Sequence, residues 1–337
     1  MLVVAAPDKF RGTATAAEVA AAVAGAAAAA GDHCDPAPVA DGGEGTLEAL
    51  GGTPRTTTVR GPLGDPVAAE WRMQADGTAI VEMARASGLA VVGGPEGNDP
   101  LRASTAGTGE LIAAAIDAGA LRVVVGAGGS ATTDGGLAAL TALNPRRRLH
   151  AGVEVVVACD VDTLFIDAAE VFAPQKGASP AQVALLRRRL ERLAQIYLRD
   201  YGVDVRDEPG SGAAGGLAGG LAAAGAVLLN GFEVVAEAVG LAERIAAADL
   251  VVTGEGLLDA ESFEGKAVGG VVALAATAGV PVLVVAGDVL AGELPEDLGP
   301  SVEVVSLVAR FGVERAMTDV AGCVAEVVGT RLTECRR

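Results

Sequence analysis

The chain has 337 residues, which is long for one hydrophobic core and predicts two domains. Hydrophobic residues make up 51% and charged residues 20%, a composition that is typical of globular proteins and excludes a disordered chain. The formal net charge of −18 argues against nucleic acid as a partner. An anionic substrate would need local positive charge or backbone amides.

The chain contains only three lysines, Lys9, Lys176 and Lys266, against many arginines. Each is there either by chance or because its compact ammonium cannot be replaced by a planar guanidinium. Four cysteines without CxxC or metal-ligand spacing indicate reduced thiols. The N-terminus lacks the basic region of a signal peptide, and glycines interrupt the apolar run at 210–231. We therefore expect a soluble, cytoplasmic protein without a membrane span.

The chain begins with alternating strand and helix patterns. Residues 2–6 form an apolar run that reads as a buried strand. An alanine-rich helix is predicted over Thr13–Ala30, with a capping box of Thr15 and Glu18 at its start. Residues 37–40 are predicted to form a second short strand, which opens into the sequence DGGEGT.

The middle of the chain reads differently. Short alternating pieces separated by turns over 56–89 indicate a mixed or antiparallel sheet. A helix is predicted at 105–119 and strands at 121–129 and 154–160. Residues 180–202 form a long amphipathic helix whose arginines are expected to make a solvated face.

Strand and helix patterns alternate again after residue 231. Segments 248–256, 280–288 and 302–307 are apolar on both faces, as central parallel strands are. Helices lie between and after them, including one over Met317–Arg331.

These patterns predict an α/β protein of two domains. Residues 1–55 and 232–337 form a discontinuous Rossmann-like, flavodoxin-like domain with a parallel sheet. Residues 56–231 are inserted between these parts as a second α/β domain, which carries glycine-rich phosphate loops.

Polar segments follow several predicted strands, at 7–11, 41–45, 253–256 and 287–288. Ligands of open parallel sheets bind outside the carboxyl ends of the strands. Each segment by itself also fits a turn or a helix cap. If the domain prediction holds, all four converge on one crevice.

The inserted region contains the sequence GAGGSATTDGG at 126–136, between a strand and a helix. Its glycines permit close approach of the backbone to a ligand, and helix N-terminal amides favour phosphate. Ser130, Thr132 and Thr133 add hydroxyl groups, and Asp134 is a candidate Mg²⁺ ligand. The segment is neither a P-loop nor a dinucleotide fingerprint.

Two other segments of this region could contact phosphate. The sequence PGSGAAGGLAGG at 209–220 is a second glycine-rich loop, although small residues also permit close helix packing. Lys176 lies in a turn-like setting suited to a point-charge contact with phosphate. Glycine-rich amides, few lysines and scattered carboxylates, with no histidine in any motif, suggest Mg²⁺-assisted phosphoryl transfer by a nucleotide-dependent kinase without a Walker motif.

Ten segments together resemble the glycerate kinase family, ATP-dependent enzymes that phosphorylate glycerate. They occur in the family's order from Ala6 to about Gly270: APDKFRGTATAAEVA, PVADGGEGTLEAL, VRGPLGDPV, VEMARASGL, TAGTGELI, GAGGSATTDGG, VACDV, VFAPQKGA, PGSGAAGGLAGGL and TGEGLLDAESFEGKA. The resemblance implies two α/β domains, one of them Rossmann-like and discontinuous, with the active site in the cleft between them. It also implies ATP and Mg²⁺ as cofactors and glycerate or a close hydroxy acid as substrate.

Within that family interpretation, the chemistry of the side chains indicates roles. The catalytic candidates are Asp8, Asp259 and Lys266. Asp259 would be the general base or a carboxylate that positions Mg²⁺, and Lys266 would contact a phosphate or the substrate carboxylate. The candidates for binding the substrate are Lys9, Arg11, Asp41, Glu44 and Glu255. Phosphate contacts are expected from Gly128, Gly129, Ser130, Thr132, Lys176 and Gly212, and metal contacts from Asp134 and Asp160. Glu261 and Glu264 are expected to be helix-face or capping acids.

The chain departs from the family pattern at several places. Lys9 and Arg11 stand where the family has serine and lysine, and Leu257 stands in an arginine position. Ala173 replaces a glycine, the segment after VACDV differs, and the segment 137–157 is shortened. These departures bear on the substrate more than on the fold.

Two other hypotheses remain beside a glycerate kinase. One is a relative with altered specificity or without catalysis that binds a nucleotide or a small hydroxy acid. The other, an unrelated Rossmann oxidoreductase, would require a glycine fingerprint after the first strand, which the sequence lacks. The sequence leaves open whether the 2- or 3-hydroxyl reacts and whether the protein is a monomer or a homodimer.

Overall fold

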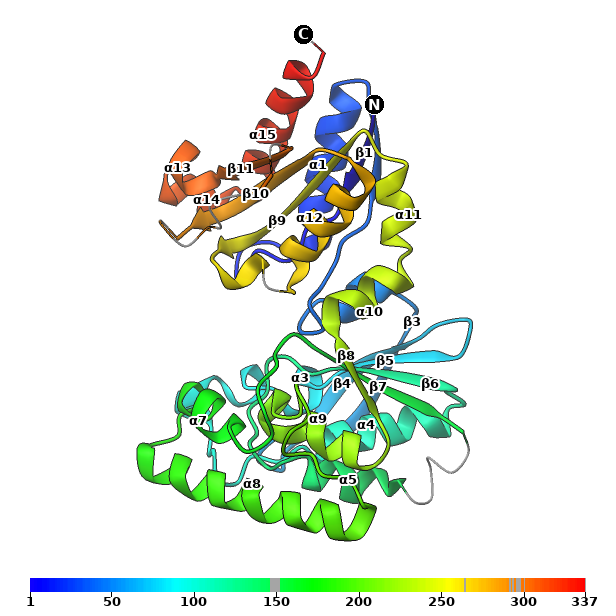
Figure 1. Ribbon diagram of the computed structural model, residues 1–337, viewed down its shortest axis with the longest axis vertical. Coiled ribbons are helices and arrows are strands. Elements are labelled where there is room, and N and C mark those ends of the chain that lie inside the picture. The colour runs from blue at the N-terminus through cyan, green and yellow to red at the C-terminus, as the bar shows by residue number, and fades with distance from the viewer. Residues whose placement is uncertain are drawn as a thin grey trace. The chain divides into compact units, whose positions relative to one another are not determined.

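The computed structural model describes residues 1–145, 152–263, 265–290, 292, 294, 298–299 and 301–336. Its chain divides into two compact units (Figure 1): unit 1 is Met1–Asp41 with Phe232–Arg337, and unit 2 is Gly42–Gly231. The first boundary therefore lies at residue 41 and not near residue 55. The reason is that the strand at 53–60 pairs along its whole length with the strand at 66–73. Glu264 lies outside the described residues.

Unit 1 alternates strands and helices in the order of an open α/β sheet. Its elements are β1 (Leu2–Ala5), α1 (Ala16–Ala29), β2 (His33–Pro36), α10 (Gly231–Ala238), α11 (Leu241–Ala246), β9 (Leu250–Leu258), η5 (Glu261–Phe263), α12 (Ala267–Ala278), β10 (Val282–Val289), β11 (Val302–Ser306), α13 (Leu307–Phe311), α14 (Val313–Thr318) and α15 (Val320–Glu334).

The sheet of unit 1 is parallel throughout, with the strand order β11-β10-β9-β1-β2. Valine dominates its central strands, whose side chains are buried on both faces as a doubly covered sheet requires. Helices α1 and α15 pack together on one face, and α12 lies on the other (Figure 1). The predicted capping box of Thr15 and Glu18 is present at the start of α1.

Two predicted elements of unit 1 were misplaced. The second strand is His33–Pro36 and not 37–40, although Ala37 and Val39 still donate backbone hydrogen bonds to the first strand and its following loop. Pro38 has no N–H group and cannot continue a regular ladder. The helix predicted at 317–331 is broken at Asp319, whose side chain accepts a hydrogen bond from the amide of Gly322 and caps α15.

Unit 2 contains a mixed sheet and its covering helices. Its elements are α2 (Thr46–Leu50), β3 (Thr53–Arg60), β4 (Pro66–Met73), β5 (Thr78–Glu82), α3 (Ala84–Ser87), η1 (Ala90–Val92), η2 (Pro95–Gly97), α4 (Ala106–Asp117), β6 (Arg122–Gly126), α5 (Leu137–Leu143), β7 (Glu154–Cys159), α7 (Ala168–Phe172), η4 (Pro174–Lys176), α8 (Pro180–Tyr201), α9 (Ala213–Ala223) and β8 (Val227–Asn230).

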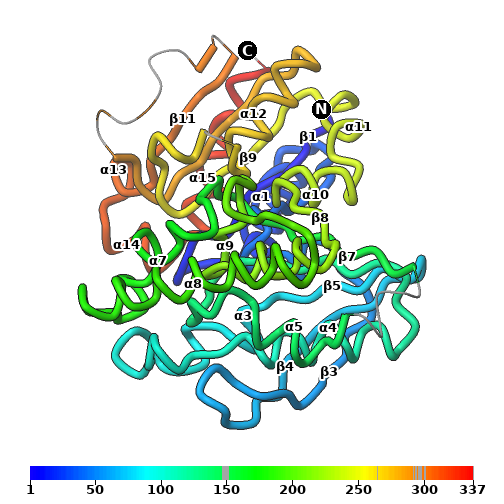
Figure 2. The backbone as a smooth tube through the Cα atoms, turned by 60° about the horizontal axis from the view of Figure 1, so that its bottom comes forward, coloured from blue at the N-terminus to red at the C-terminus, as the bar shows by residue number. Residues whose placement is uncertain are grey.

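The strand order of unit 2 is β3-β4-β5-β6-β7-β8. The pairs from β3 to β5 are antiparallel and those from β5 to β8 are parallel, which confirms the mixed sheet predicted over 56–89. Helix α4 packs on β3 to β6, α9 packs on β7 and β8, and the long helix α8 lies against α7 and α9 (Figure 2). Within the described part of the chain, no helix is both long and apolar enough to cross a bilayer.

Candidate active site

The carboxyl edge of the unit 1 sheet carries a cluster of acids and lysines. The adjacent strands β1 and β9 run parallel, and the amide of Asp8 donates to the carbonyl of Gly254 at 2.9 Å. This bond places Asp8 beside Glu255, the next residue of β9. Gly256 permits the contact between the two loops, because a Cβ atom there would lie 3.1 Å from the backbone nitrogen of Arg11.

Lys9 joins two carboxylates of the cluster. Its Nζ lies 3.2 Å from Oδ2 of Asp8 and 3.5 Å from Oδ1 of Asp41, so the loops after β1 and β2 are tied together. Burial raises the pKa of Asp8 to about 6; the ammonium of Lys9 opposes this rise, and Asp41 adds to it. The pKa of Lys9 lies above its usual value, because burial lowers it by less than Asp41 and Asp8 together raise it.

Glu255 holds a carboxyl oxygen that is buried and unpaired. Among the described residues, Oε1 of Glu255 has no hydrogen-bond partner. Burial is the main cause that raises the pKa of Glu255 to about 7. The charges of Asp8 and Asp259 also raise this pKa, whereas a hydrogen bond with Ser262 and the charge of Lys266 lower it. A carboxyl with a pKa near neutrality can take up and release a proton under ordinary conditions.

Asp259 and Lys266 lie in the same loop with other partners. Oδ1 of Asp259 accepts hydrogen bonds from the amide of Ser262 at 3.0 Å and from its hydroxyl at 3.1 Å. Asp259 therefore holds the turn into η5. Nζ of Lys266 donates to Oε2 of the exposed Glu261 at 2.9 Å. Glu261 is thus the surface partner of a candidate catalytic lysine.

The remaining candidates of unit 1 lie at the margin of this cluster. Arg11 is exposed, and its charge opposes protonation of Lys9. Leu257 is 47% exposed, an unusual setting for a large apolar side chain at the end of a core strand. Asp288 pairs in register with Leu257, and its Oδ1 accepts from the hydroxyl of Ser306 at 3.3 Å. Glu44 belongs to unit 2 and is exposed, and its part in substrate binding stays a prediction.

The glycine loop of unit 2 is built by close backbone packing. A Cβ atom on Gly126 would lie 2.7 Å from the carbonyl of Gly42, and one on Gly128 would lie 2.6 Å from Cα of Gly43. Gly129 has a φ of +68°, in the left-handed region that favours glycine. Among the described residues, no hydrogen bond uses the N–H groups of Gly128 and Gly129. These amides are available to an anion.

Lys176 is buried behind this loop and holds it. Its Nζ donates to Oγ of Ser130 and to the carbonyl of Thr132, both at 2.6 Å, and the side chain is only 3% exposed. Burial lowers the pKa of Lys176 to about 7, and the charge of Asp134 opposes that change. The structure therefore brings Ser130, Thr132 and Lys176 together, and their contacts with phosphate stay a prediction.

The second glycine-rich loop serves packing. The amide of Gly212 donates to the carbonyl of Thr163 at 2.9 Å, and a Cβ atom on Gly212 would lie 2.4 Å from the carbonyl of Leu164. A Cβ atom on Gly215 would lie 2.0 Å from the carbonyl of Thr132. Of the two alternatives for this segment, the geometry favours close packing, and the amide of Gly212 is already engaged.

Neither metal candidate lies in a group of ligands. Oδ2 of Asp134 accepts from the amide and hydroxyl of Thr105, both at 2.9 Å, and Oδ1 accepts from the amide of Gly136 at 3.1 Å. Asp160 follows β7 directly and is partly exposed. Among the described residues, no three His, Cys, Asp or Glu side chains are grouped as metal ligands.

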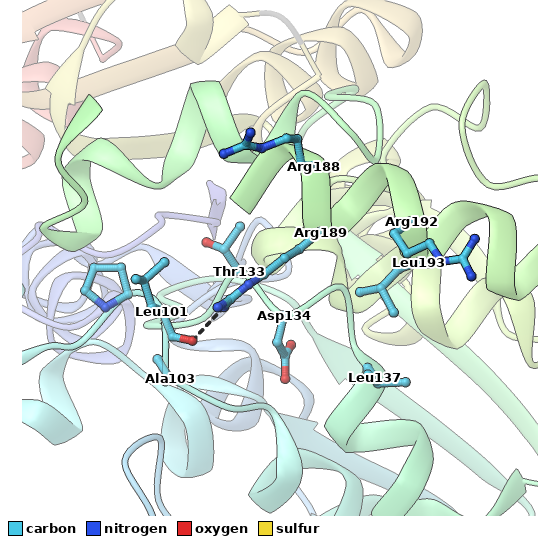
Figure 3. Close-up of a pocket in the computed structure, with 10 residues that line it drawn as sticks. Leu101, Ala103, Thr133, Asp134, Leu137, Arg188, Arg189, Arg192 and Leu193 are labelled. Atoms are coloured by element: carbon cyan, nitrogen blue, oxygen red, sulfur yellow. Dashed lines mark hydrogen bonds between the residues drawn. The ribbon is translucent and has the colours of Figure 1, made fainter. Parts of the chain in front are cut away.

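A cavity of about 430 Å³ adjoins the glycine loop of unit 2 (Figure 3). Its wall is largely apolar, with Thr133 and Asp134 at the loop and Arg188, Arg189 and Arg192 from α8. The guanidinium of Arg189 reaches across to the carbonyl of Leu101 at 2.8 Å. Four of the five arginines of α8 are exposed, as the sequence predicted, and Arg187 is half-buried. Three of the exposed arginines also line a cavity whose size suits a small molecule.

Sequence reasoning missed one buried acid. Glu82 is 1% exposed, and its Oε1 accepts from the amides of Gly45 and Leu47 at 2.9 and 3.0 Å. Arg85 donates to its other oxygen at 3.0 Å. Glu82 thus fixes the DGGEGT loop within unit 2. An acid directly at the end of an apolar strand was the available signal.

The chain matches a known family over most of its length. The model of the "Glycerate kinase family" matches residues 3–148 and 144–328. The chain is 38% identical over 337 residues to "Glycerate 2-kinase" of Escherichia coli K12. This match covers 89% of the present chain and 87% of the relative. It is 38% identical to "Glycerate kinase" of Bacillus subtilis, with 86% and 85% covered. An uncharacterised protein of Mycobacterium tuberculosis is 44% identical over 302 residues, which cover 86% and 79% of the two chains.

A solved structure shows the same architecture. It is described as the crystal structure of putative glycerate kinase 2 from Salmonella typhimurium LT2, with a TM-score of 0.81, 34% identity and 99% of each chain covered. The sequence motifs, the two α/β units and these matches agree. The chain therefore belongs to the glycerate kinase family and is a kinase.

Proposed function

We propose that the protein transfers the γ-phosphoryl group of ATP to the 2-hydroxyl of D-glycerate. The observation that carries this proposal is the cluster of Asp8, Lys9, Asp41, Glu255 and Lys266 in a chain of this family. The printed name of the Escherichia coli relative, "Glycerate 2-kinase", supports the choice of hydroxyl.

The unit 1 cluster offers what a small hydroxy acid needs. Glycerate carries one carboxylate and two hydroxyls, and the ammonium groups of Lys9 and Lys266 can attract the carboxylate in a protein that is otherwise strongly acidic. Carboxylates such as Asp8 and Asp41 accept hydrogen bonds from hydroxyl groups. Lys9 stands in a serine position of the family pattern, so it adds charge where Leu257 removes it.

The glycine loop of unit 2 offers what phosphates need. The unused amides of Gly128 and Gly129 and the hydroxyl of Ser130 are donors, and Lys176 is poised between its charged and neutral forms with a pKa of about 7 that burial lowers. A bound phosphate would favour the charged form. The candidates for binding glycerate belong mainly to unit 1 and those for ATP to unit 2, so we propose that the reaction uses residues of both units.

Mg²⁺ fits this donor set as an ion carried by the nucleotide. Mg²⁺ usually keeps several waters and binds one or two carboxylates together with substrate phosphates, so no cage of protein ligands is required. Asp134 and Asp160 stay the candidates for such a contact; Asp134 is already oriented by Thr105 and Gly136. When bound, the ion would neutralise charge on the phosphates. A reaction that consumes ATP is consistent with a cytoplasmic enzyme.

A coupled assay of ADP release with ATP, Mg²⁺ and D-glycerate tests this function. L-glycerate and other small hydroxy acids serve as competing acceptors. Lys266→Ala should lose turnover, and Arg199→Ala, on the surface of α8 and paired with Asp200, should retain it. Turnover on another hydroxy acid alone would favour altered specificity, for which the exposed Leu257 is the observation. Folded protein that binds ATP and turns over no hydroxy acid would contradict the proposal.

A further inference from the structure

The cluster of unit 1 contains one polar atom that the fold itself leaves unsatisfied. Oε1 of Glu255 is buried and has no hydrogen-bond partner among the described residues. Buried polar atoms without a partner are rare in folded proteins, and each calls for an explanation such as a catalytic role or a bound ligand. A hydroxyl of the substrate is the type of group that would satisfy a carboxylate oxygen.

We propose that Glu255, and not Asp259, accepts the proton of the reacting hydroxyl. This inference rests on the proposed phosphorylation of glycerate. Glu255 lies on β9, a central strand of the sheet. Its backbone is fixed by parallel pairing with β10 on one side, and the amide of Asp8 donates to the carbonyl of the preceding Gly254 on the other. A proton acceptor on such a rigid element is well positioned for catalysis.

Asp259 is less suited to this role. Its Oδ1 already accepts two hydrogen bonds from Ser262, and these bonds shape the turn that follows β9. Protonation of Asp259 would weaken the turn that it holds. Ser262 also interacts with Glu255, so Asp259 and Ser262 together position Glu255. We therefore assign Asp259 as a positioning residue.

The step balances without another reagent. The hydroxyl of glycerate donates its proton to Oε1 of Glu255 as its oxygen forms a bond to the γ-phosphorus of ATP. The bond between the γ-phosphorus and the β–γ bridging oxygen breaks, and ADP leaves with that electron pair. The products are phosphoglycerate and ADP, and Glu255 afterwards loses the proton to solvent.

The charges around Glu255 favour proton uptake near neutral pH. Asp8 faces it from the loop after β1 and Asp259 from the loop after β9, and both raise its pKa after burial, which is the largest cause. Lys266 opposes them. Lys9 and Asp41 lie one contact further away, around Asp8. The ionised form of Glu255 is thus a stronger base than an ordinary glutamate.

The test compares three variants with the wild type in steady-state kinetics from pH 5.5 to 9. Glu255→Gln keeps the size of the side chain and removes the proton acceptor. Glu255→Asp restores a carboxylate on a shorter stem. Glu243→Gln removes one exposed carboxylate on α11, outside the cluster, and serves as the charge control. Binding of D-glycerate to each protein is measured by calorimetry, which reports the site independently of turnover.

The expected result is a 10²- to 10⁴-fold fall in kcat for Glu255→Gln, with glycerate affinity within a few-fold of the wild type. The wild type and Glu243→Gln should share a fall in kcat/KM below pH 7 that Glu255→Gln lacks in its residual activity. Glu255→Asp should recover part of kcat together with that fall. Retention of kcat within threefold by Glu255→Gln, or an unchanged pH profile, would overturn the assignment. A wild type that does not phosphorylate glycerate would instead refute the proposed function.

Discussion

Replacement of Glu255 by glutamine should stabilise the ligand-free protein at pH 8. Burial is the main cause that raises the pKa of Glu255 from 4.5 to about 7. A group whose pKa is higher in the folded than in the unfolded state lowers stability as the pH rises through that interval. The displacement corresponds to roughly 3 kcal/mol, so above pH 7 we expect the variant to gain about 1 to 3 kcal/mol.

The gain should depend on pH in a defined direction. Near pH 5 the folded wild type is largely protonated at Glu255, and the difference between the proteins should fall below about 1 kcal/mol. Urea unfolding of both proteins at pH 5 and pH 8, followed by circular dichroism, measures the difference. Glu261→Gln removes an exposed carboxylate from the same loop and should change stability by less than about 1 kcal/mol at either pH. The reasoning would be refuted by a Glu255→Gln variant that is less stable at pH 8, or by a difference that is the same at both pH values.

Substitutions at four other positions test separate parts of the structure. Gly126→Ala should destabilise unit 2 by about 1 to 3 kcal/mol, because the added Cβ would meet the carbonyl of Gly42 at 2.7 Å. Gly25→Ala, on the open surface of α1, should stabilise unit 1 by roughly 0.5 to 1 kcal/mol. Urea unfolding compares the two glycine variants, and equal midpoints would contradict the expectation that they shift stability in opposite directions. Lys176→Met, which removes the donors to Ser130 and Thr132, should raise the KM for ATP about tenfold, and Lys176→Arg should not rescue it because the site is 3% exposed. An ATP KM within twofold of the wild type would place Lys176 outside the nucleotide site. Leu257→Arg, at a position that is 47% exposed, adds a possible contact for the substrate carboxylate. It should lower the KM for D-glycerate about three- to tenfold. A higher KM would show that Lys9 already fills that role.

The architecture of the chain could be predicted because it depends on local and repetitive signals. Runs of valine marked the central strands, and the pair of Thr15 and Glu18 marked the start of α1. The exact position of β2 could not be predicted, since its regular pairing with β1 ends at Pro36 although single backbone hydrogen bonds continue to Val39. The boundary at residue 41 depends on the pairing of β3 with β4, which is a long-range property.

The grouping of several candidate residues could be predicted, whereas their individual roles could not. Topology brings Asp8, Asp41 and Glu255 to one edge of a parallel sheet, and that rule can be applied to a sequence. Which acid is engaged and which is left unpaired depends on side-chain geometry, and Asp259 and Glu255 differ in this respect. The same limit applies to the glycine loops, because close backbone packing and phosphate binding select the same residue type.

The identity of the product tests the central claim most directly. The protein is incubated with ATP, Mg²⁺ and D-glycerate, and the proton-coupled ³¹P NMR spectrum of the mixture is recorded. A phosphate ester on the 2-hydroxyl has one neighbouring carbon-bound proton and gives a doublet, whereas an ester on the 3-hydroxyl has two and gives a triplet. We predict a growing doublet that depends on glycerate and is absent with Lys266→Ala. A triplet would contradict the choice of hydroxyl, and the appearance of inorganic phosphate without any ester would contradict the phosphorylation of glycerate.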